Sequence, residues 1–151
     1  MNTARASALI RRPPRHVFDA FANADSITKF WLRHTSGPLA PDAVVDWEFM
    51  VPGATEKVTV TSFEAERRIA FKWSSGLTIE MKFVAYRDND THVTIEVTGF
   101  EPEHLLEQVA NVVEGFSIVL CDLKTLLEQG QSANLVRDKA ELIASSKSAG
   151  T

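Results

Sequence analysis

The stretch from Glu103 to Gln129 constrains the fold more than any other part of the sequence. Its apolar residues recur at steps of three and four, which is the period of one helix face. These residues are Leu105, Val109, Val112, Val113, Phe116, Leu120, Leu123 and Leu127. Pro102 suits the first turn of a helix, and Gly130 suits the position just past its end. We predict one helix over residues 103–129, roughly 40 Å long at about 1.5 Å per residue, which is long enough to cross a small domain.

Gly115 lies in the middle of this predicted helix. On an exposed helix face a glycine costs about 1 kcal/mol relative to alanine. It therefore indicates a bend or a close backbone contact. The alternative is that the glycine has no special role and is tolerated because neighbouring elements stabilise the helix.

Ahead of the helix the apolar period changes to two, which is typical of β-strands with one buried face. Five runs alternate in this way, over residues 44–50, 56–63, 68–73, 77–86 and 92–100. Their short connections predict an antiparallel meander. One face collects Trp47, Phe49, Val58, Val60, Ile69, Phe71, Trp73, Leu77, Ile79, Met81, Phe83, Val93, Ile95 and Val97. The other face is polar, so we expect a sheet covered on one side only, with the long helix as its cover.

The remaining segments complete an α+β domain over residues 1–130. Ala6 to Ile10 reads as a further strand, giving about six strands, and two short helices follow, the second over Ser26 to Trp31. A loop rich in turn formers is expected from His34 to Asp42. Residues 131–151 form a C-terminal extension. In it Asn134 could cap a short helix over residues 135–144, with Leu135, Val136, Leu142 and Ile143 as its apolar face. This extension, or a second subunit, is expected to cover Ile118 of the long helix.

Composition and charge exclude several classes of function. The net charge is −4 and the basic residues are scattered, which argues against nucleic acid as a partner. Cys121 is the only cysteine, and the four histidines lack metal-ligand spacing, so we expect neither a disulfide nor a metal site, and no cofactor. No export signal and no apolar run of membrane-spanning length is evident, so we expect a cytoplasmic protein without a membrane partner.

The sequence contains no evident catalytic constellation. Strand parity places Glu48, Glu80 and Glu96 on the polar face, where Lys72 and Lys82 are natural cross-strand partners. A β-bulge could turn one of these carboxylates inward and make it a general acid or base. Without such a bulge, no catalytic residue is expected.

The inward-facing aromatic residues and neighbouring side chains are the candidates for ligand binding. Large rigid rings line hydrophobic pockets, although they also simply fill cores. His34, after Trp31, is placed by this interpretation at the mouth of the cavity, where it could donate to a ligand or simply be solvated. The complete candidate set is Trp31, His34, Trp47, Phe49, Phe71, Trp73, Met81, Phe83, Val112 and Phe116.

Three stretches resemble a known family. They are IRRPPRHVFDAF at residues 10–21, VTVTSFEAERRIAFKW at residues 58–73 and EGFSIVLCDLKTLLEQG at residues 114–130, together with Trp31. They resemble the Hsp90-ATPase-activator-like branch of the START/Bet v 1-like (SRPBCC) superfamily over roughly residues 6–130. The chain departs from this family at Glu66-Arg67, where a proline is frequent, and at Phe116, where a tryptophan is frequent.

The resemblance implies a helix-grip fold, in which a curved antiparallel sheet wraps around a long C-terminal helix. It favours non-catalytic binding of a small hydrophobic or amphipathic molecule between sheet and helix. One alternative is a module that interacts with an Hsp90-type chaperone, and a less favoured one is an enzyme of the polyketide cyclase or aromatase kind. The protein is expected to be a monomer or a homodimer.

Overall fold

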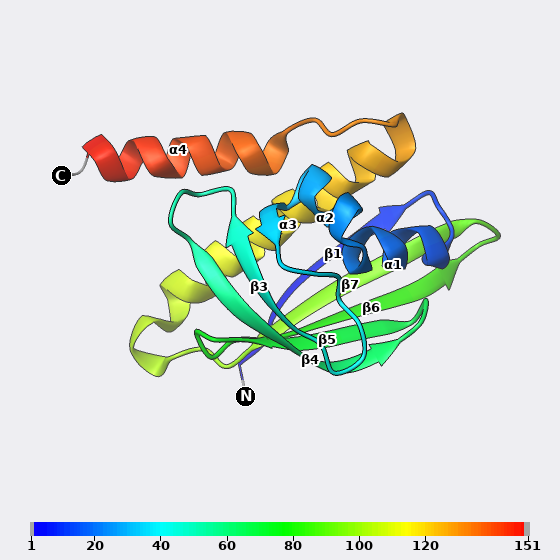
Figure 1. The fold of residues 1–151 in the computed structure, drawn as a ribbon, viewed down its shortest axis with the longest axis horizontal. Coiled ribbons are helices and arrows are strands. Elements are labelled where there is room, and N and C mark those ends of the chain that lie inside the picture. Colours follow the sequence, from blue (N-terminus) through cyan, green and yellow to red (C-terminus); the bar gives the residue numbers. More distant parts are fainter. Residues whose placement is uncertain (1, 150–151) are drawn as a thin grey trace.

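A curved antiparallel sheet dominates the computed structural model, which describes residues 2–149 (Figure 1). The sheet has seven strands in the order β1-β7-β6-β5-β4-β3-β2. Their bounds are β1 Ala4–Ile10, β2 Leu32–Thr35, β3 Val44–Phe49, β4 Thr55–Glu64, β5 Arg68–Trp73, β6 Thr78–Tyr86 and β7 Asp90–Thr98. All neighbouring strands pair antiparallel, so the predicted meander is confirmed.

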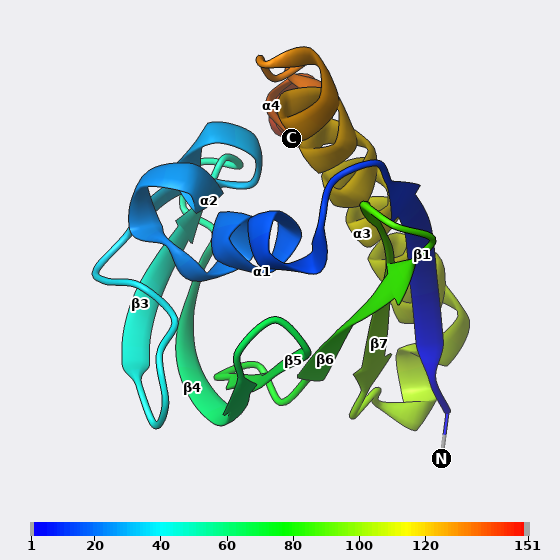
Figure 2. The ribbon, with the colours of Figure 1, turned by 90° about the vertical axis from the view of Figure 1, so that its right-hand side faces the viewer.

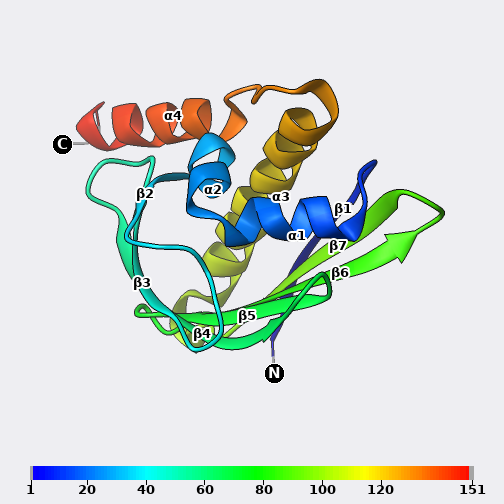
Figure 3. The same cartoon turned by 45° about the vertical axis from the view of Figure 1, so that its right-hand side comes forward.

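The sheet bends into a trough, and the helices lie on its concave side (Figure 2). The helices are α1 Pro14–Ala22, α2 Ala24–Phe30, a 3-10 turn η1 Pro102–His104, α3 Leu105–Gln129 and α4 Leu135–Ala149. The long helix α3 runs diagonally across the trough, α1 and α2 fill its open side, and α4 lies across the top (Figure 3). This arrangement is the helix-grip fold that the sequence predicts.

Side-chain burial follows the predicted alternation of the strands. Val58, Ile69, Ile79, Val93 and Ile95 are fully buried on the concave side. A bulge between Val60 and Ser62 interrupts the alternation in β4. The bulge turns Phe63 inward against Phe18, with ring centroids 5.2 Å apart.

The seventh strand, β2, was not expected from the sequence. The loop predicted from His34 to Asp42 begins too early, because Leu32–Thr35 pairs with β3 at the edge of the sheet. The strand has only four residues, and its register shifts between Leu32 and His34. It buries its two ends and exposes Arg33 and His34, so it lacks the alternation by which the other strands are recognised.

The long helix begins and ends close to the two residues that were predicted to mark its ends, Pro102 and Gly130. Pro102 opens the 3-10 turn that leads into α3. At the other end Gly130 has φ +86°, and its N–H donates to the Leu126 carbonyl at 3.0 Å. This left-handed cap ends α3 and allows the chain to reverse toward α4.

Helix α4 is longer than predicted, and only two of the four residues predicted for its apolar face lie on its inward side. It runs to Ala149, and Leu135 and Leu142 are exposed by 37% and 66%, which corrects the predicted apolar face. Val136 and Ile143, the other two residues predicted for that face, line the pocket against α3, together with Ala140, which was not predicted. Together they extend over Ile118, the residue that the extension was expected to cover.

Candidate functional site: a pocket beneath helix α4

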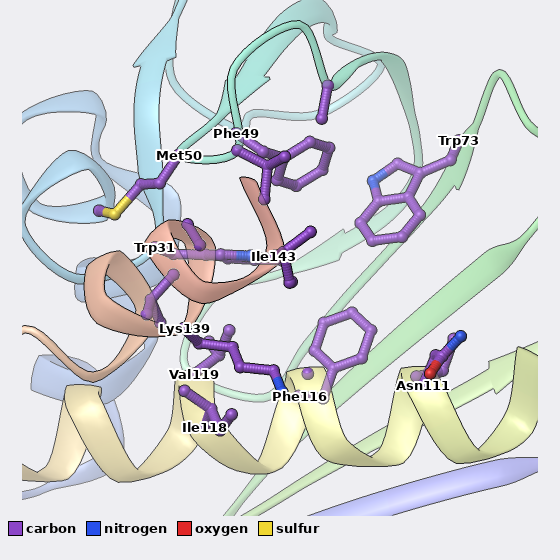
Figure 4. Close-up of a pocket in the computed structure, with 16 residues that line it drawn as sticks. Trp31, Phe49, Met50, Trp73, Asn111, Phe116, Ile118, Val119, Lys139 and Ile143 are labelled. Carbon is purple, nitrogen blue, oxygen red and sulfur yellow. The ribbon is translucent and has the colours of Figure 1, made fainter. Parts of the chain in front are cut away.

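A pocket of about 310 Å³ lies where the middle of α3, the β3–β4 turn and α4 meet (Figure 4). Aromatic rings from four parts of the chain form its walls: Trp31, Phe49, Trp73 and Phe116. Residues of the β3–β4 turn and of α3 add Met50, Val51, Ala54, Asn111, Val112, Gly115, Ile118 and Val119. Helix α4 contributes Val136, Lys139, Ala140 and Ile143. The pocket is therefore an apolar space with few polar groups at its rim.

The aromatic walls hold one another in place. The rings of Trp73 and Phe116 are stacked, with centroids 5.9 Å apart and planes inclined by 17°. Trp31 meets Phe116 edge-on at 5.5 Å. Phe49 contacts Trp73 in the same edge-on manner at 5.6 Å. Such interlocked rings lose little conformational entropy when a flat apolar molecule contacts them.

Trp73 brings an unsatisfied donor to this apolar surface. Its indole Nε1–H is buried and has no hydrogen-bond partner among the described residues. In Figure 4 the nitrogen edge of the indole faces Phe49, on the inner side of the pocket. A buried donor without a partner costs about 1–3 kcal/mol. Because the nitrogen is covered, a molecule in the pocket would contact the indole ring and not this N–H.

Lys139 is the one titratable side chain among the described residues that line the pocket. Its Nζ lies 3.0 Å from Glu114 Oε1 on α3. Figure 4 shows its side chain reaching from α4 toward Phe116 on α3. The aliphatic stem covers apolar wall while the ammonium group stays at the rim, as is usual for lysines at such boundaries.

Gly115 has a role that the sequence did not reveal. It lies in an unbroken helix, and a Cβ added there would meet no atom within 4 Å. The close backbone contact considered for it is therefore absent. The glycine instead forms part of the pocket wall and leaves space in front of it.

The structure divides the ten predicted ligand-binding residues into three groups. Five line the pocket: Trp31, Phe49, Trp73, Val112 and Phe116. Four are packed in the core with no more than 4% of their surface exposed: Trp47, Phe71, Met81 and Phe83. His34 is exposed on β2 and borders a separate polar hollow with Glu48 and Lys57. Strand parity placed the core residues on the correct face, but it does not show which inward positions remain accessible.

The three glutamates expected on the polar face lie there. Glu80 is hydrogen-bonded to Arg68 Nε at 2.6 Å, and Lys82 lies between Glu80 and Glu96 at 3.4 and 3.8 Å. Burial raises the pKa of Glu80, but hydrogen bonds and charge from Arg68 and Lys82 outweigh this and leave the pKa below its usual value. Glu48 pairs with Arg33 at 3.7 Å. The bulges lie in β2 and β4, so none of the three turns inward.

The contribution of α4 was predicted only in part. Val136 and Ile143 belonged to the predicted apolar face, whereas Ala140 was not predicted, because Leu135 and Leu142 are more apolar residues at neighbouring positions. Lys139 carried no signal, because a single lysine on an amphipathic helix is ordinarily solvated. The β3–β4 turn residues were likewise read only as turn formers.

The described part of the chain offers no group of histidine, cysteine, aspartate or glutamate side chains arranged to hold a metal ion. Between residues 2 and 149, none of the helices is both long and apolar enough to cross a membrane.

Comparison with known proteins places the chain in a defined context. The family model described as "Activator of Hsp90 ATPase homolog 1-like protein" matches residues 11–128. No curated protein matches the sequence. The matched residues begin just after β1 and include strands β2 to β7 and nearly all of α3, whereas α4 lies beyond them.

Several solved structures share the fold. Protein SSP2350 from Staphylococcus saprophyticus superposes with a TM-score of 0.77 at 23% identity, covering 87% of this chain and 95% of that one. The Aha1 protein from Colwellia psychrerythraea, solved in solution as a dimer, gives 0.78 at 18% identity, with 87% and 100% covered. DynU16, a putative protein of the dynemicin biosynthetic locus, gives 0.77 at 19% identity, with 87% and 49% covered. At these identities the likeness shows a common fold.

Proposed function

The chain belongs to the Activator of Hsp90 ATPase homolog 1-like family, and on this premise we propose that it binds a small hydrophobic or amphipathic molecule without transforming it. The binding site is the pocket between the sheet, α3 and α4. Its volume of about 310 Å³ lies at the lower end of the range of small-molecule sites.

The observation that carries this proposal is the apolar pocket itself, whose walls are four aromatic rings held against one another. Apolar walls with a small number of placed polar groups are the usual composition of a ligand site. In this pocket the walls are Trp31, Phe49, Trp73 and Phe116, and the polar side chains of the described lining are Asn111 and Lys139.

The lining residues favour binding over catalysis. Lys139 is the only titratable group in the described lining, so the pocket offers no pair of groups for acid–base work. The candidate carboxylates Glu80 and Glu96 are engaged on the opposite face of the sheet. This composition supports a carrier or sensor of its ligand.

The test is to block the pocket from α3. Gly115→Phe and, independently, Val112→Phe introduce a ring into the pocket wall, and Ala110→Phe places the same ring on an exposed part of the helix as the control. Binding of the fluorescent apolar probe N-phenyl-1-naphthylamine is then titrated. The blocking variants are expected to weaken binding by about tenfold or more, as the loss of much of the contact area implies. Wild-type affinity in both blocking variants would refute the proposed site.

A second candidate function is interaction with an Hsp90-type chaperone. The family match over residues 11–128 favours it, because the family is named for activators of the Hsp90 ATPase. The test is whether the purified protein binds Hsp90 and changes its rate of ATP turnover. Light scattering of the same sample tests whether this chain forms a dimer, as its Colwellia relative does.

A further inference from the structure

We propose that the pocket selects anionic amphipathic molecules, with Lys139 as the receptor for the anionic group and Glu114 as the internal carboxylate that such a ligand displaces. The inference rests on the proposed ligand-binding function and specifies the class of ligand. The class is an apolar ring system that carries one carboxylate or sulfonate.

The first step is the position of the charge. Lys139 lies in the pocket lining on α4, and its side chain is 36% exposed. Its ammonium group therefore sits at a boundary between water and the aromatic walls. Near apolar surface the effective dielectric constant falls, so an ion pair there is stronger than in bulk water.

The second step is the sign of the charge. The pocket lining carries one positive side chain, whereas the whole chain has a net charge of −4. A general attraction of the protein for anions is thus absent. Any preference for an anionic ligand must come from the local field of Lys139.

The third step is the present partner of Lys139. Glu114 Oε1 lies 3.0 Å from the ammonium group, and the Glu114 side chain is 55% exposed. An exposed carboxylate loses little when it returns to water, so a ligand anion can replace it at small cost. Glu114 consequently acts as a competitor of the ligand, and removing its charge should tighten the binding of anions.

The geometry also places the two polar groups apart. Figure 4 shows Lys139 and Trp73 on different sides of the Phe116 ring. A ligand anchored by its anion at Lys139 would lay its ring system over Phe116. Its far end would then contact the indole ring of Trp73, whose N–H is covered.

The experiment uses two probes that share a ring system. 1-Anilinonaphthalene-8-sulfonate carries a sulfonate, and N-phenyl-1-naphthylamine is the same molecule without it. Both are titrated by fluorescence against wild type, Lys139→Gln and Glu114→Gln. Arg137→Gln is the matched control, because Arg137 is an exposed positive residue of the same helix outside the pocket lining.

The charged probe should respond in opposite directions to the two changes. Lys139→Gln is expected to weaken its binding about two- to fivefold, and Glu114→Gln to tighten it about twofold, as expected for an ion pair that is partly exposed to water. The neutral probe should bind all variants within about twofold, because its apolar contacts are unchanged. Arg137→Gln should leave both probes unaffected.

The outcomes separate this inference from the proposed function. If the neutral probe binds but the sulfonate probe is insensitive to both Lys139→Gln and Glu114→Gln, the charge selection is refuted while the pocket remains a ligand site. If neither probe binds wild type, the proposed function fails, and the inference fails with it. Circular dichroism of each variant confirms that the fold is retained.

Discussion

Asp122 Oδ1 accepts a hydrogen bond of 2.6 Å from the Ser132 hydroxyl, although the two residues belong to different elements. The other carboxylate oxygen accepts the Val136 N–H at 3.3 Å, in the first turn of α4. Asp122 is only 1% exposed, so α3 carries a buried carboxylate whose partners all belong to the segment that starts α4. These bonds orient α4 and thereby hold Lys139 over the pocket.

Replacing Asp122 by alanine should detach the start of α4. Two part-buried donors would lose their acceptor, which we expect to lower the free energy of unfolding by about 1–3 kcal/mol. Ser132→Ala removes one of the two bonds and should cost about 1 kcal/mol. Urea unfolding measures both values, and hydrogen exchange should show faster exchange of the α4 amides in Asp122→Ala. Unchanged protection of α4 in that variant would contradict the anchoring role.

Gly115→Ala should stabilise the protein. A Cβ at this position meets no atom within 4 Å, so the alanine gains helix propensity without a clash. The expected gain in the free energy of unfolding is about 0.5–1 kcal/mol. Gly130→Ala provides the opposite control, because φ +86° at the end of α3 disfavours any Cβ. Urea unfolding that finds Gly115→Ala less stable than wild type would show that the space in front of the glycine is not free.

The main architecture could be predicted because the residues at the ends of the elements and the spacing of the apolar residues indicated the same helix and strands. Pro102 and Gly130 marked the ends of the long helix, and alternation assigned the faces of β3 to β7, apart from the end of β4 beyond its bulge. Strand β2 was missed because four residues with a register shift carry no regular period.

The candidate site was predicted only in part. The alternation along a strand shows which side chains point inward, but it does not show which of them remain accessible to a ligand. Trp47 and Trp73 are both inward by parity, yet Trp47 lies in the interior of β3 and is 2% exposed. Trp73 ends β5 beside a turn, where the sheet stops covering it, and it lines the pocket. The face that α4 buries was decided by the tertiary bonds of Asp122, which no local pattern reveals.

His34→Ala should leave ligand binding unchanged. The side chain is exposed on the edge strand β2 and borders the polar hollow with Glu48, away from the aromatic walls. The affinity for N-phenyl-1-naphthylamine is expected to remain within about twofold of wild type, since none of the apolar contact area is lost. A clear loss of affinity, with the fold intact by circular dichroism, would restore the sequence-based hypothesis that this histidine contacts the ligand.

Glu128 should make stability depend on pH in the acid range. Its Oε2 accepts the Arg11 N–H at 2.8 Å and pairs with Lys124 Nζ at 2.6 Å, which joins the end of α3 to the segment after β1. Burial raises the pKa of Glu128, but the Arg11 N–H and the Lys124 ammonium outweigh this and hold the pKa below its ordinary value of 4.5. A lowered carboxyl pKa stabilises the folded state above the unfolded pKa, and this stabilisation is lost as the pH falls through the folded pKa.

The measurement is the difference in unfolding free energy between wild type and Glu128→Gln as a function of pH. At about pH 7 the difference should be about 1–2 kcal/mol in favour of wild type, because the ionised carboxylate accepts charge-assisted bonds. Below about pH 4.5 it should shrink as the wild-type carboxyl group becomes protonated and resembles the amide. Glu141→Gln, at an exposed position on α4, should show little difference at any pH. A Glu128→Gln difference that stayed constant down to about pH 2 would mean that packing of the side chain, and not its charge, joins α3 to β1.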